Sequence, residues 1–267
     1  MTLANYNDIA IGPVTIHMYG LMIALGFIAA YIMTSKRAKN NGLDDDVIWG
    51  IFIGALVGGL LGTKILYYIV SIPDIINDIS ILWDFKNGYV VYGGIIGGVI
   101  AAYFVCKRHR VNFLEYFDLT MPAVSLGQAF GRLGCTFAGC CYGRETDCIA
   151  HITYESSSFA PNGVALIPTQ LISSAGNLLI MILLLIFSRK NDKEGRVGAL
   201  YFILYGIGRF GVEFLRNDYR GSIGVLSTSQ FISCILVVVG ILAFIWFGRD
   251  KTLGNRWEGM KHIKSEK

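Results

Sequence analysis

The sequence is poor in charged residues. Asp, Glu, Lys and Arg make up only 16 % of its 267 residues, whereas a soluble globular domain carries about 25 %. Hydrophobic residues reach 54 %, and the mean hydropathy is +0.53. This balance excludes an ordinary water-soluble enzyme and also a disordered, collagen-like or coiled-coil chain. It indicates a membrane protein.

The chain also shows no cleavable signal peptide, internal repeat or linker. Its first 15 residues hold Asn5, Asn7 and Asp8, and they have no positively charged start of the kind that a signal peptide needs. We therefore expect a single integral membrane domain over residues 1–267.

Seven apolar stretches approach the roughly 20 residues that a membrane-spanning helix needs. Four of them contain no charged residue: Ile16–Met33, Tyr89–Cys106, Leu166–Phe187 and Ser227–Phe247. Three are interrupted by ionisable residues: Val47–Ile72 by Lys64, Leu119–Phe137 by Arg132, and Gly198–Leu215 by Arg209 and Glu213. The pattern predicts an all-α polytopic membrane protein with seven transmembrane helices.

Lys and Arg follow every second stretch, which fixes an expected orientation because short cytoplasmic loops are enriched in them. The N-terminus is predicted outside and the C-terminus inside, with a cytoplasmic tail at about 248–267. The outer segments are then 73–88, 138–165 and 217–226, of which 138–165 forms a small outer loop region. Because the basic residues lie in the short loops predicted to be cytoplasmic, the net charge of +4 does not indicate nucleic-acid binding.

Ionisable side chains at membrane depth are costly and usually face a protein interior or a wet cavity. We expect Lys64 to reach the outer surface with its long side chain. Arg209 and Glu213 are four residues apart and share a helix face, so they form either a structural pair or part of a site. Arg132, Arg209 and Arg216 together suit an anionic headgroup, because guanidinium groups bind phosphate oxygens in bidentate fashion.

Glycine is abundant, with 32 residues against 5 prolines. Gly54, Gly58 and Gly62 recur at four-residue spacing, which is typical of close helix packing. The pairs Gly93/Gly97 and Gly94/Gly98 have the same spacing.

Six cysteines are present. Cys106 and Cys234 are interpreted as buried structural thiols. The other four, Cys135, Cys140, Cys141 and Cys148, are close in sequence. They admit disulfides or structural thiols, metal binding or redox sensing, and direct thiol chemistry. The adjacent pair Cys140–Cys141 departs from the usual CxxC spacing of zinc sites.

Several motifs, taken in order, resemble those of the prolipoprotein diacylglyceryl transferase family. The signature-like segment is Gly131-Arg132-Leu133-Gly134, closed by Gly143. The others are Tyr19-Gly20-Leu21, Tyr92-Gly93-Gly94-Ile95-Ile96-Gly97, Pro168-Thr169-Gln170-Leu171, Tyr205-Gly206 through Arg216, and Ser229-Gln230. The resemblance runs from about residue 12 to residue 247, and it implies seven spans with the N-terminus outside.

The resemblance implies a transferase of the bacterial cytoplasmic membrane. The family moves diacylglyceryl from phosphatidylglycerol to the lipobox cysteine thiol of a prolipoprotein, so its partners are that lipid, the precursor's signal peptide and the bilayer. Carried over by position, the catalytic residues are Arg132, Arg209 and Tyr92. The substrate-binding residues are Arg132, Tyr19, Gly143, Glu213, Arg216, Gln170 and Gln230. No cofactor is expected and no metal either, the candidate ligands being Cys135, Cys140, Cys141 and Cys148. The motif glycines, Gly93 and Gly97 included, are expected to leave room at the phosphate site.

The sequence departs from the family pattern at five positions. Tyr92 replaces a histidine, Cys135 an asparagine, Cys140 an acidic residue, Ile167 a histidine and Ser173 a glutamate. Three alternatives therefore stay open beside the transferase: a related enzyme that uses an anionic phospholipid with a different acceptor, a non-catalytic lipid or anion transporter, and a redox-sensing membrane protein.

Overall fold

The computed structural model describes residues 2–3, 7–11, 14–84, 88–218 and 221–249, so the predicted tail at 248–267 lies outside the described residues from 250 onward. In the described part, seven helices have 18 residues or more. They are α1 (Met18–Asn41), α2 (Asp45–Val70), α4 (Val91–Arg108), α5 (Phe113–Ala138), α6 (Thr169–Lys190), α7 (Arg196–Glu213) and α8 (Thr228–Arg249). Each corresponds to one predicted stretch.

Five of these helices, α1, α2, α4, α6 and α8, are long and apolar enough to cross a membrane. The other two carry several ionisable residues, Arg132 among them in α5 and both Arg209 and Glu213 in α7. The mostly helical fold of an α-helical membrane protein is therefore confirmed. The short elements α3 (Ile72–Asn77) and a 3-10 helix, η1 (Ile79–Trp83), follow α2.

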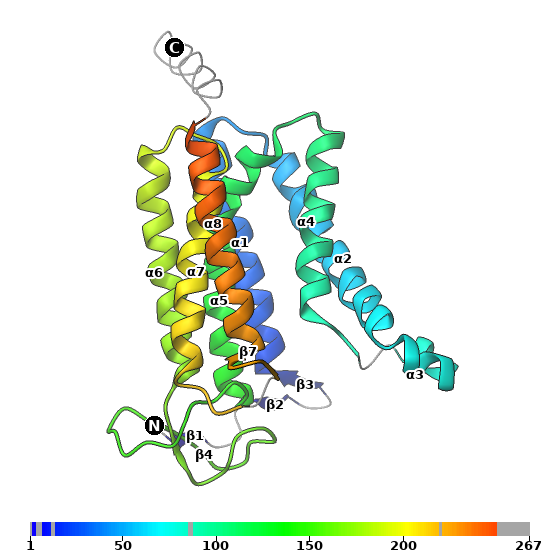
Figure 1. Cartoon of the computed structure of the whole chain (residues 1–267), viewed down its shortest axis with the longest axis vertical. Helices are drawn as coiled ribbons and strands as arrows, with labels where there is room; N and C mark the ends of the chain where they lie inside the picture. Colours follow the sequence, from blue (N-terminus) through cyan, green and yellow to red (C-terminus); the bar gives the residue numbers. More distant parts are fainter. Residues whose placement is uncertain (1, 4–6, 12–13, 85–87, 219–220, 250–267) are drawn as a thin grey trace. The chain divides into compact units, whose positions relative to one another are not determined.

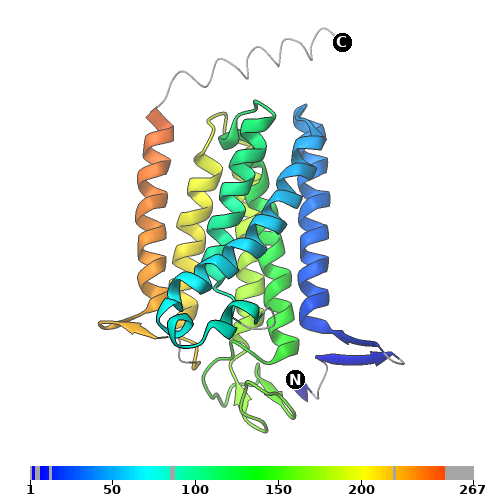
Figure 2. The ribbon, with the colours of Figure 1, turned by 90° about the vertical axis from the view of Figure 1, so that its right-hand side faces the viewer.

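Short strands complete the described structure. They are β1 (Thr2–Leu3), β2 (Asp8–Ile11), β3 (Val14–His17), β4 (Ile152–Tyr154), β5 (Ala165–Leu166), β6 (Ser222–Ile223) and β7 (Leu226–Ser227). The strands β1, β4 and β5 form one small sheet, and β2–β3 and β6–β7 form antiparallel pairs. All lie at one end of the helices of their unit, as Figure 2 shows. The segment after α5 has its own core of Ile152, Tyr154, Ala160 and Leu166.

The chain divides into two compact units, of which the smaller comprises residues 34–116. Within it α2 and α4 lie side by side (Figure 1). A Cβ atom built on Gly62 would overlap the carbonyl of Gly93, and one on Gly97 would overlap the carbonyl of Gly58. The close packing predicted for Gly54, Gly58 and Gly62 is confirmed at Gly58 and Gly62. The expectation that Gly93 and Gly97 leave room for a headgroup is wrong, because these residues bring two backbones into contact.

Lys64 lies in this smaller unit and does not extend into solvent. Only 8 % of the residue is exposed. Its ammonium group donates to the Asp84 carbonyl and lies 5.0 Å from the ring centroids of both Tyr67 and Tyr89. Cation–π contacts and a carbonyl acceptor stabilise the charge inside the unit, so the expectation that Lys64 reaches the surface is wrong.

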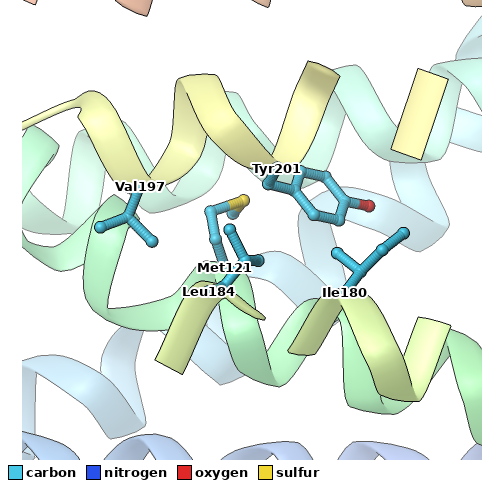
Figure 3. Close-up of a cluster of buried hydrophobic side chains, with 5 residues drawn as sticks. All are labelled: Met121, Ile180, Leu184, Val197 and Tyr201. Atoms are coloured by element: carbon cyan, nitrogen blue, oxygen red, sulfur yellow. The ribbon is translucent and has the colours of Figure 1, made fainter. Parts of the chain in front are cut away.

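The larger unit comprises residues 1–33 and 117–267. Its helices α5, α6 and α7 share a core in which Met121, Ile180, Leu184, Val197 and Tyr201 converge (Figure 3). Each of the three helices contributes to this cluster, which accounts for their association through apolar contact.

Side-chain hydrogen bonds also join α5 to α6. The Ser125 hydroxyl donates to the Asn177 carbonyl at 2.8 Å, and the Ser174 hydroxyl donates to the Ala129 carbonyl at 3.0 Å. Small residues and hydroxyl side chains are the usual means of joining helices in apolar surroundings. The result is a fixed arrangement of α5 and α6 on the side where Arg132 lies.

Candidate active site

A cavity of about 60 Å³ opens between α5, α6 and α7. Arg132 of α5 and Arg209 of α7 both line it. The structure thus brings together these two predicted site residues. On this scale the cavity holds several water molecules, which suits a small anionic group such as a phosphate. Two guanidinium groups in one partly enclosed cavity provide the fixed positive charge that such a group needs.

Arg209 is held in place by neighbours from two helices. Its Nη1 atom lies 2.8 Å from Glu213 Oε2, and its Nη2 atom donates to the Ser229 hydroxyl at 2.7 Å. The pair of Arg209 and Glu213, which the sequence left as one of two alternatives, is present. Because the carboxylate neutralises part of its charge, Arg209 is a positioned but already paired cation.

Arg132 has different surroundings. Its Nη1 atom donates to the Cys141 sulfur at 3.8 Å. Among the described residues, no carboxylate oxygen lies within ion-pair distance of Arg132. Its charge thus remains available to an anion in the cavity.

Arg216, also a predicted ligand of the substrate, is bound by the protein itself. Its Nε and Nη2 atoms donate to the two Asp218 carboxylate oxygens at 2.8 and 2.5 Å, and the side chain is 3 % exposed. Arg216 Nε also lies 3.9 Å from Glu213 Oε2. This bidentate pair fixes the segment after α7, and Arg216 is not among the residues that line the cavity.

Gly143 lies where three segments meet. It forms a bridge with Arg216, while the next residue, Arg144, donates its N–H to the Leu215 carbonyl and accepts from the Ile167 N–H, each at 2.9 Å. A Cβ atom at Gly143 would be 2.5 Å from the Ile167 carbonyl oxygen. A glycine is required here so that the segments around α6 and α7 can approach each other closely.

The two predicted glutamines have local structural partners. Gln170 is 2 % exposed, and its Nε2 atom donates to the Cys140 carbonyl at 2.9 Å and the Tyr154 hydroxyl at 3.2 Å. Gln230 Oε1 accepts from the Ser227 N–H at 3.1 Å, and the Ser227 hydroxyl accepts from the Gln230 N–H at the same distance. The second arrangement is a capping box at the start of α8.

The two predicted tyrosines lie in different units. Tyr19 is in the first turn of α1. Its ring lies close to Gly134 of α5, where an added Cβ atom would be 3.2 Å from the ring. Tyr92 is the second residue of α4, in the unit of residues 34–116, and is 46 % exposed. The role assigned to Tyr92 stays a prediction.

Three of the six cysteines form a cluster. Of the two expected to be buried thiols elsewhere, Cys106 is buried, whereas Cys234 is exposed and its interpretation is wrong. No two of the six form a disulfide in the described part of the chain, so the interpretation as disulfides finds no support. The sulfur atoms of Cys135, Cys140 and Cys141 all lie within 4.8 Å of one another, while Cys148 is exposed and outside this group. Hydrogen bonding to the Cys135 and Cys141 thiols, together with burial, raises the pKa of Cys140 well above its ordinary value.

Some residues of the site were not predicted from the sequence. Tyr205, Ser173 and Asn177 line the cavity beside the arginines, as does Gly208, one of the motif glycines expected at the phosphate site. Tyr205 is four residues before Arg209, and this spacing places both on one helix face. The spacing could therefore have identified Tyr205 as a residue of the site. Ser173 occupies the position of a family glutamate, and the cavity therefore lacks a carboxylate at that point.

The chain was also compared with known proteins. The family model for "Prolipoprotein diacylglyceryl transferase" matches residues 8–246. This match includes every element from α1 to α7, most of α8, and both cavity arginines.

Curated relatives agree with this match. A protein of Clostridium tetani named phosphatidylglycerol–prolipoprotein diacylglyceryl transferase is 48 % identical over 229 residues, which is 86 % of this chain and 92 % of the relative. Similar proteins from Clostridium perfringens and Finegoldia magna are 44 % and 35 % identical, over 86 % and 89 % of this chain and 90 % and 93 % of their own lengths. These relatives carry the same activity in their names.

Proposed function

Because the chain belongs to the prolipoprotein diacylglyceryl transferase family, we propose that it moves diacylglyceryl from phosphatidylglycerol to the lipobox cysteine of a prolipoprotein. The observation that carries this proposal is the cavity lined by Arg132 and Arg209. Phosphatidylglycerol presents a phosphate diester, and its cleavage leaves additional negative charge on the departing phosphate. Positive groups fixed where charge develops stabilise such a transition state most effectively.

In the proposed step, the acceptor sulfur attacks the glycerol carbon that is bonded to the phosphate oxygen. A carbon–sulfur bond forms, and the electron pair of the broken carbon–oxygen bond leaves with glycerol phosphate. The thiol proton passes to a base, since the thiolate is the effective nucleophile. Tyr92 is proposed for this proton transfer because it occupies the family's histidine position, although a phenol of pKa near 10 is a weak base at neutral pH.

The two arginines have different roles in binding the phosphate. Arg132, which has no carboxylate partner among the described residues, supplies the stronger charge to the phosphate. Arg209 is oriented by Glu213 and Ser229, so it holds one fixed direction for a hydrogen bond. Glu213 and Arg216 position the end of α7, while Tyr19, Gly143, Gln170 and Gln230 shape the surroundings of the lipid.

The proposal includes a membrane arrangement. All seven long helices span the cytoplasmic membrane of a bacterium, with the N-terminus outside and the tail inside, in one integral domain. The basic residues after every second helix support this orientation. The cavity then faces the outer leaflet side, together with the segment between α5 and α6, where a secreted precursor presents its lipobox.

Complementation tests this function directly. A bacterial host is depleted of its own transferase, the full chain is expressed, and a reporter lipoprotein is analysed by mass spectrometry. We expect diacylglyceryl on the lipobox cysteine and restored growth. A chain that is well expressed in the membrane but leaves the reporter unmodified would refute the proposal, and lipid found on another outer-face molecule would favour the related enzyme with a different acceptor.

A further inference from the structure

The three clustered thiols lie at the end of α5 that adjoins the cavity. Cys135 is in the last turn of α5, and Cys140 and Cys141 follow in the turn after it. Their sulfur atoms all lie within 4.8 Å of one another. Cys135 and Cys141 are buried, whereas Cys140 is partly accessible. The cluster therefore has a protected interior and one side from which a small ligand can enter.

The backbone is shaped to bring these sulfurs together. Gly139 has φ = +72° and Cys141 has φ = +64°. The left-handed region is unfavourable for a non-glycine residue, and a strained residue of this kind persists only where its surroundings determine it. Here Thr169 Oγ1 donates to the Cys141 carbonyl at 2.8 Å and Gln170 Nε2 donates to the Cys140 carbonyl at 2.9 Å. Two side chains of α6 thus hold the turn in place.

The chemistry of the donor set selects the metal. Three thiolates suit a thiophilic cation such as zinc, which binds cysteine sulfur at about 2.3 Å. Tetrahedral bonds of that length place the sulfurs roughly 3.8 Å apart. The observed separations of up to 4.8 Å need only a small contraction. A divalent ion with three thiolates carries one negative charge, and the Arg132 guanidinium, 3.8 Å from the Cys141 sulfur, is placed to balance it.

We propose that Cys135, Cys140 and Cys141 bind a zinc ion whose fourth position accepts the sulfur of the acceptor cysteine. Among the described residues, no fourth cysteine, histidine or carboxylate joins the group. Zinc sites with three protein ligands and an open position are typical of catalysis, whereas structural sites are closed by four. This inference rests on the proposed function for the identity of the acceptor, but the metal site itself does not.

The zinc site explains how the acceptor thiol is deprotonated in the proposed mechanism. A thiol that binds zinc loses its proton readily, so the weak base proposed above, Tyr92, is sufficient to accept it. The bound thiolate then forms the carbon–sulfur bond as described above, the carbon–oxygen bond breaks, and glycerol phosphate leaves. Zinc stays divalent throughout, and no oxidant or reductant takes part. Arg132 contacts both Cys141 and the cavity, and thus connects nucleophile and leaving group.

Metal content is the first test, and it does not depend on activity. The full chain is purified in detergent, loaded with zinc, passed through a desalting column and analysed by mass spectrometry of the elements. We expect about one zinc per chain, lost in Cys135→Ala, Cys140→Ala and Cys141→Ala but retained in the matched controls Cys106→Ala, Cys148→Ala and Cys234→Ala. Zinc that is absent from the wild type, or equally bound by all six variants, would overturn the site.

Cobalt supplies a readout on the unmutated protein, in case a variant fails to fold. Cobalt-loaded wild type should show thiolate-to-metal charge-transfer bands. A lipobox peptide that contains cysteine should shift these bands, while the same peptide with serine should not. Identical spectra with both peptides would overturn the role of the open position.

The two proposals fail in different ways. Diacylglyceryl transfer by a wild type that binds no zinc would refute the zinc site and leave the transferase in place. Zinc bound stoichiometrically by a chain that modifies no lipobox would refute the transferase and leave the metal site in place.

Discussion

The pair α2–α4 and the group α5–α7 are both rich in glycine, but the glycines at the α2–α4 contact and those beside the cavity have opposite surroundings. In α2–α4, a Cβ atom at Gly62 or Gly97 would overlap a backbone carbonyl of the facing helix. In α5–α7, a Cβ atom at Gly176 or Gly208 would meet nothing within 4 Å, and both residues line the cavity. The same residue type therefore joins two backbones in one unit and leaves a space in the other.

This difference separates stability from activity. Glycines at a helix contact contribute to folding, because any side chain there forces the backbones apart. Glycines beside a cavity contribute nothing to packing and cost helix stability, roughly 1 kcal/mol each relative to alanine. Their retention at such positions is explained by the space that a ligand needs. Substitutions in the two regions should accordingly have effects on different measurements.

The largest effect is expected from loss of charge at the cavity. Arg132→Ala should lower the rate of diacylglyceryl transfer by about 10²–10³-fold, because the departing phosphate loses a cation that no carboxylate neutralises among the described residues. The rate is measured with purified protein and labelled phosphatidylglycerol. Thermal unfolding should be almost unchanged. Arg189→Ala, at the exposed end of α6, removes the same charge elsewhere and should transfer normally; an equal loss there would show that net charge, not the cavity, matters.

The second-largest effect is expected at the α2–α4 contact, where a substitution should change folding stability and leave transfer unaffected. Gly62→Ala should destabilise the protein by about 3 kcal/mol, since the new methyl group meets a carbonyl that cannot rotate away. The midpoint of thermal unfolding in detergent reports the change. Gly59→Ala is the matched control on the same helix, because its Cβ atom would lie 3.6 Å from the nearest atom, the Gly94 carbonyl oxygen. If both variants unfold at the same temperature, the contact between the two helices is not as close as described.

The reverse result is expected at the cavity glycine Gly208. A leucine there should fill the cavity and lower transfer by about 30-fold, equivalent to roughly 2 kcal/mol, a cost within the range for one misplaced apolar group in a binding site. Stability should rise or stay constant, since leucine is the better helix former. Transfer assays and thermal unfolding are run on the same preparation. A variant that loses stability and retains activity would reverse the comparison between the two regions.

The sequence was sufficient to locate the helices, because long apolar stretches have few alternatives in a membrane protein. It also grouped Arg132 with Arg209, since a charge inside an apolar stretch needs a polar interior. It did not distinguish the two uses of glycine, which depend on what lies opposite in the fold. Nor did it reveal that Asp218 binds Arg216 or that aromatic rings surround Lys64, because both depend on the conformations of connecting segments.

The arrangement of the cysteines also depends on backbone conformation, which the sequence pattern does not determine. Their spacing left disulfides, metal binding and direct chemistry open, because adjacent cysteines ordinarily direct their side chains apart. The left-handed backbone at Cys141 is what unites the three sulfurs, and no residue-type preference predicts it for a cysteine. Gln170, by contrast, was identified by its motif, although its position as the anchor of this turn required the structure.

A smaller effect is expected at Tyr92, which precedes the close-packed Gly93 in α4. Tyr92→Phe keeps the ring and removes the hydroxyl, so the α2–α4 contact and the unfolding temperature should not change. Transfer should fall by about tenfold, below the usual range for general base catalysis, because a phenol is a weak base at neutral pH. The rate is followed against pH. An unchanged rate would mean that position 92 serves helix packing alone, and that the acceptor thiol loses its proton elsewhere.

The smallest effect is expected where α5 is joined to α6. Since the cavity keeps these helices from uniform close packing, single side-chain bonds such as that from Ser125 to the Asn177 carbonyl hold them together. Ser125→Ala should lower stability by about 0.6 kcal/mol, the average for hydrogen bonds between membrane helices. Ser233→Ala is the control, because this equally buried hydroxyl donates to the Ser229 carbonyl of its own helix. A loss that is no greater for Ser125→Ala than for Ser233→Ala would mean that the core in Figure 3 alone holds α5 against α6.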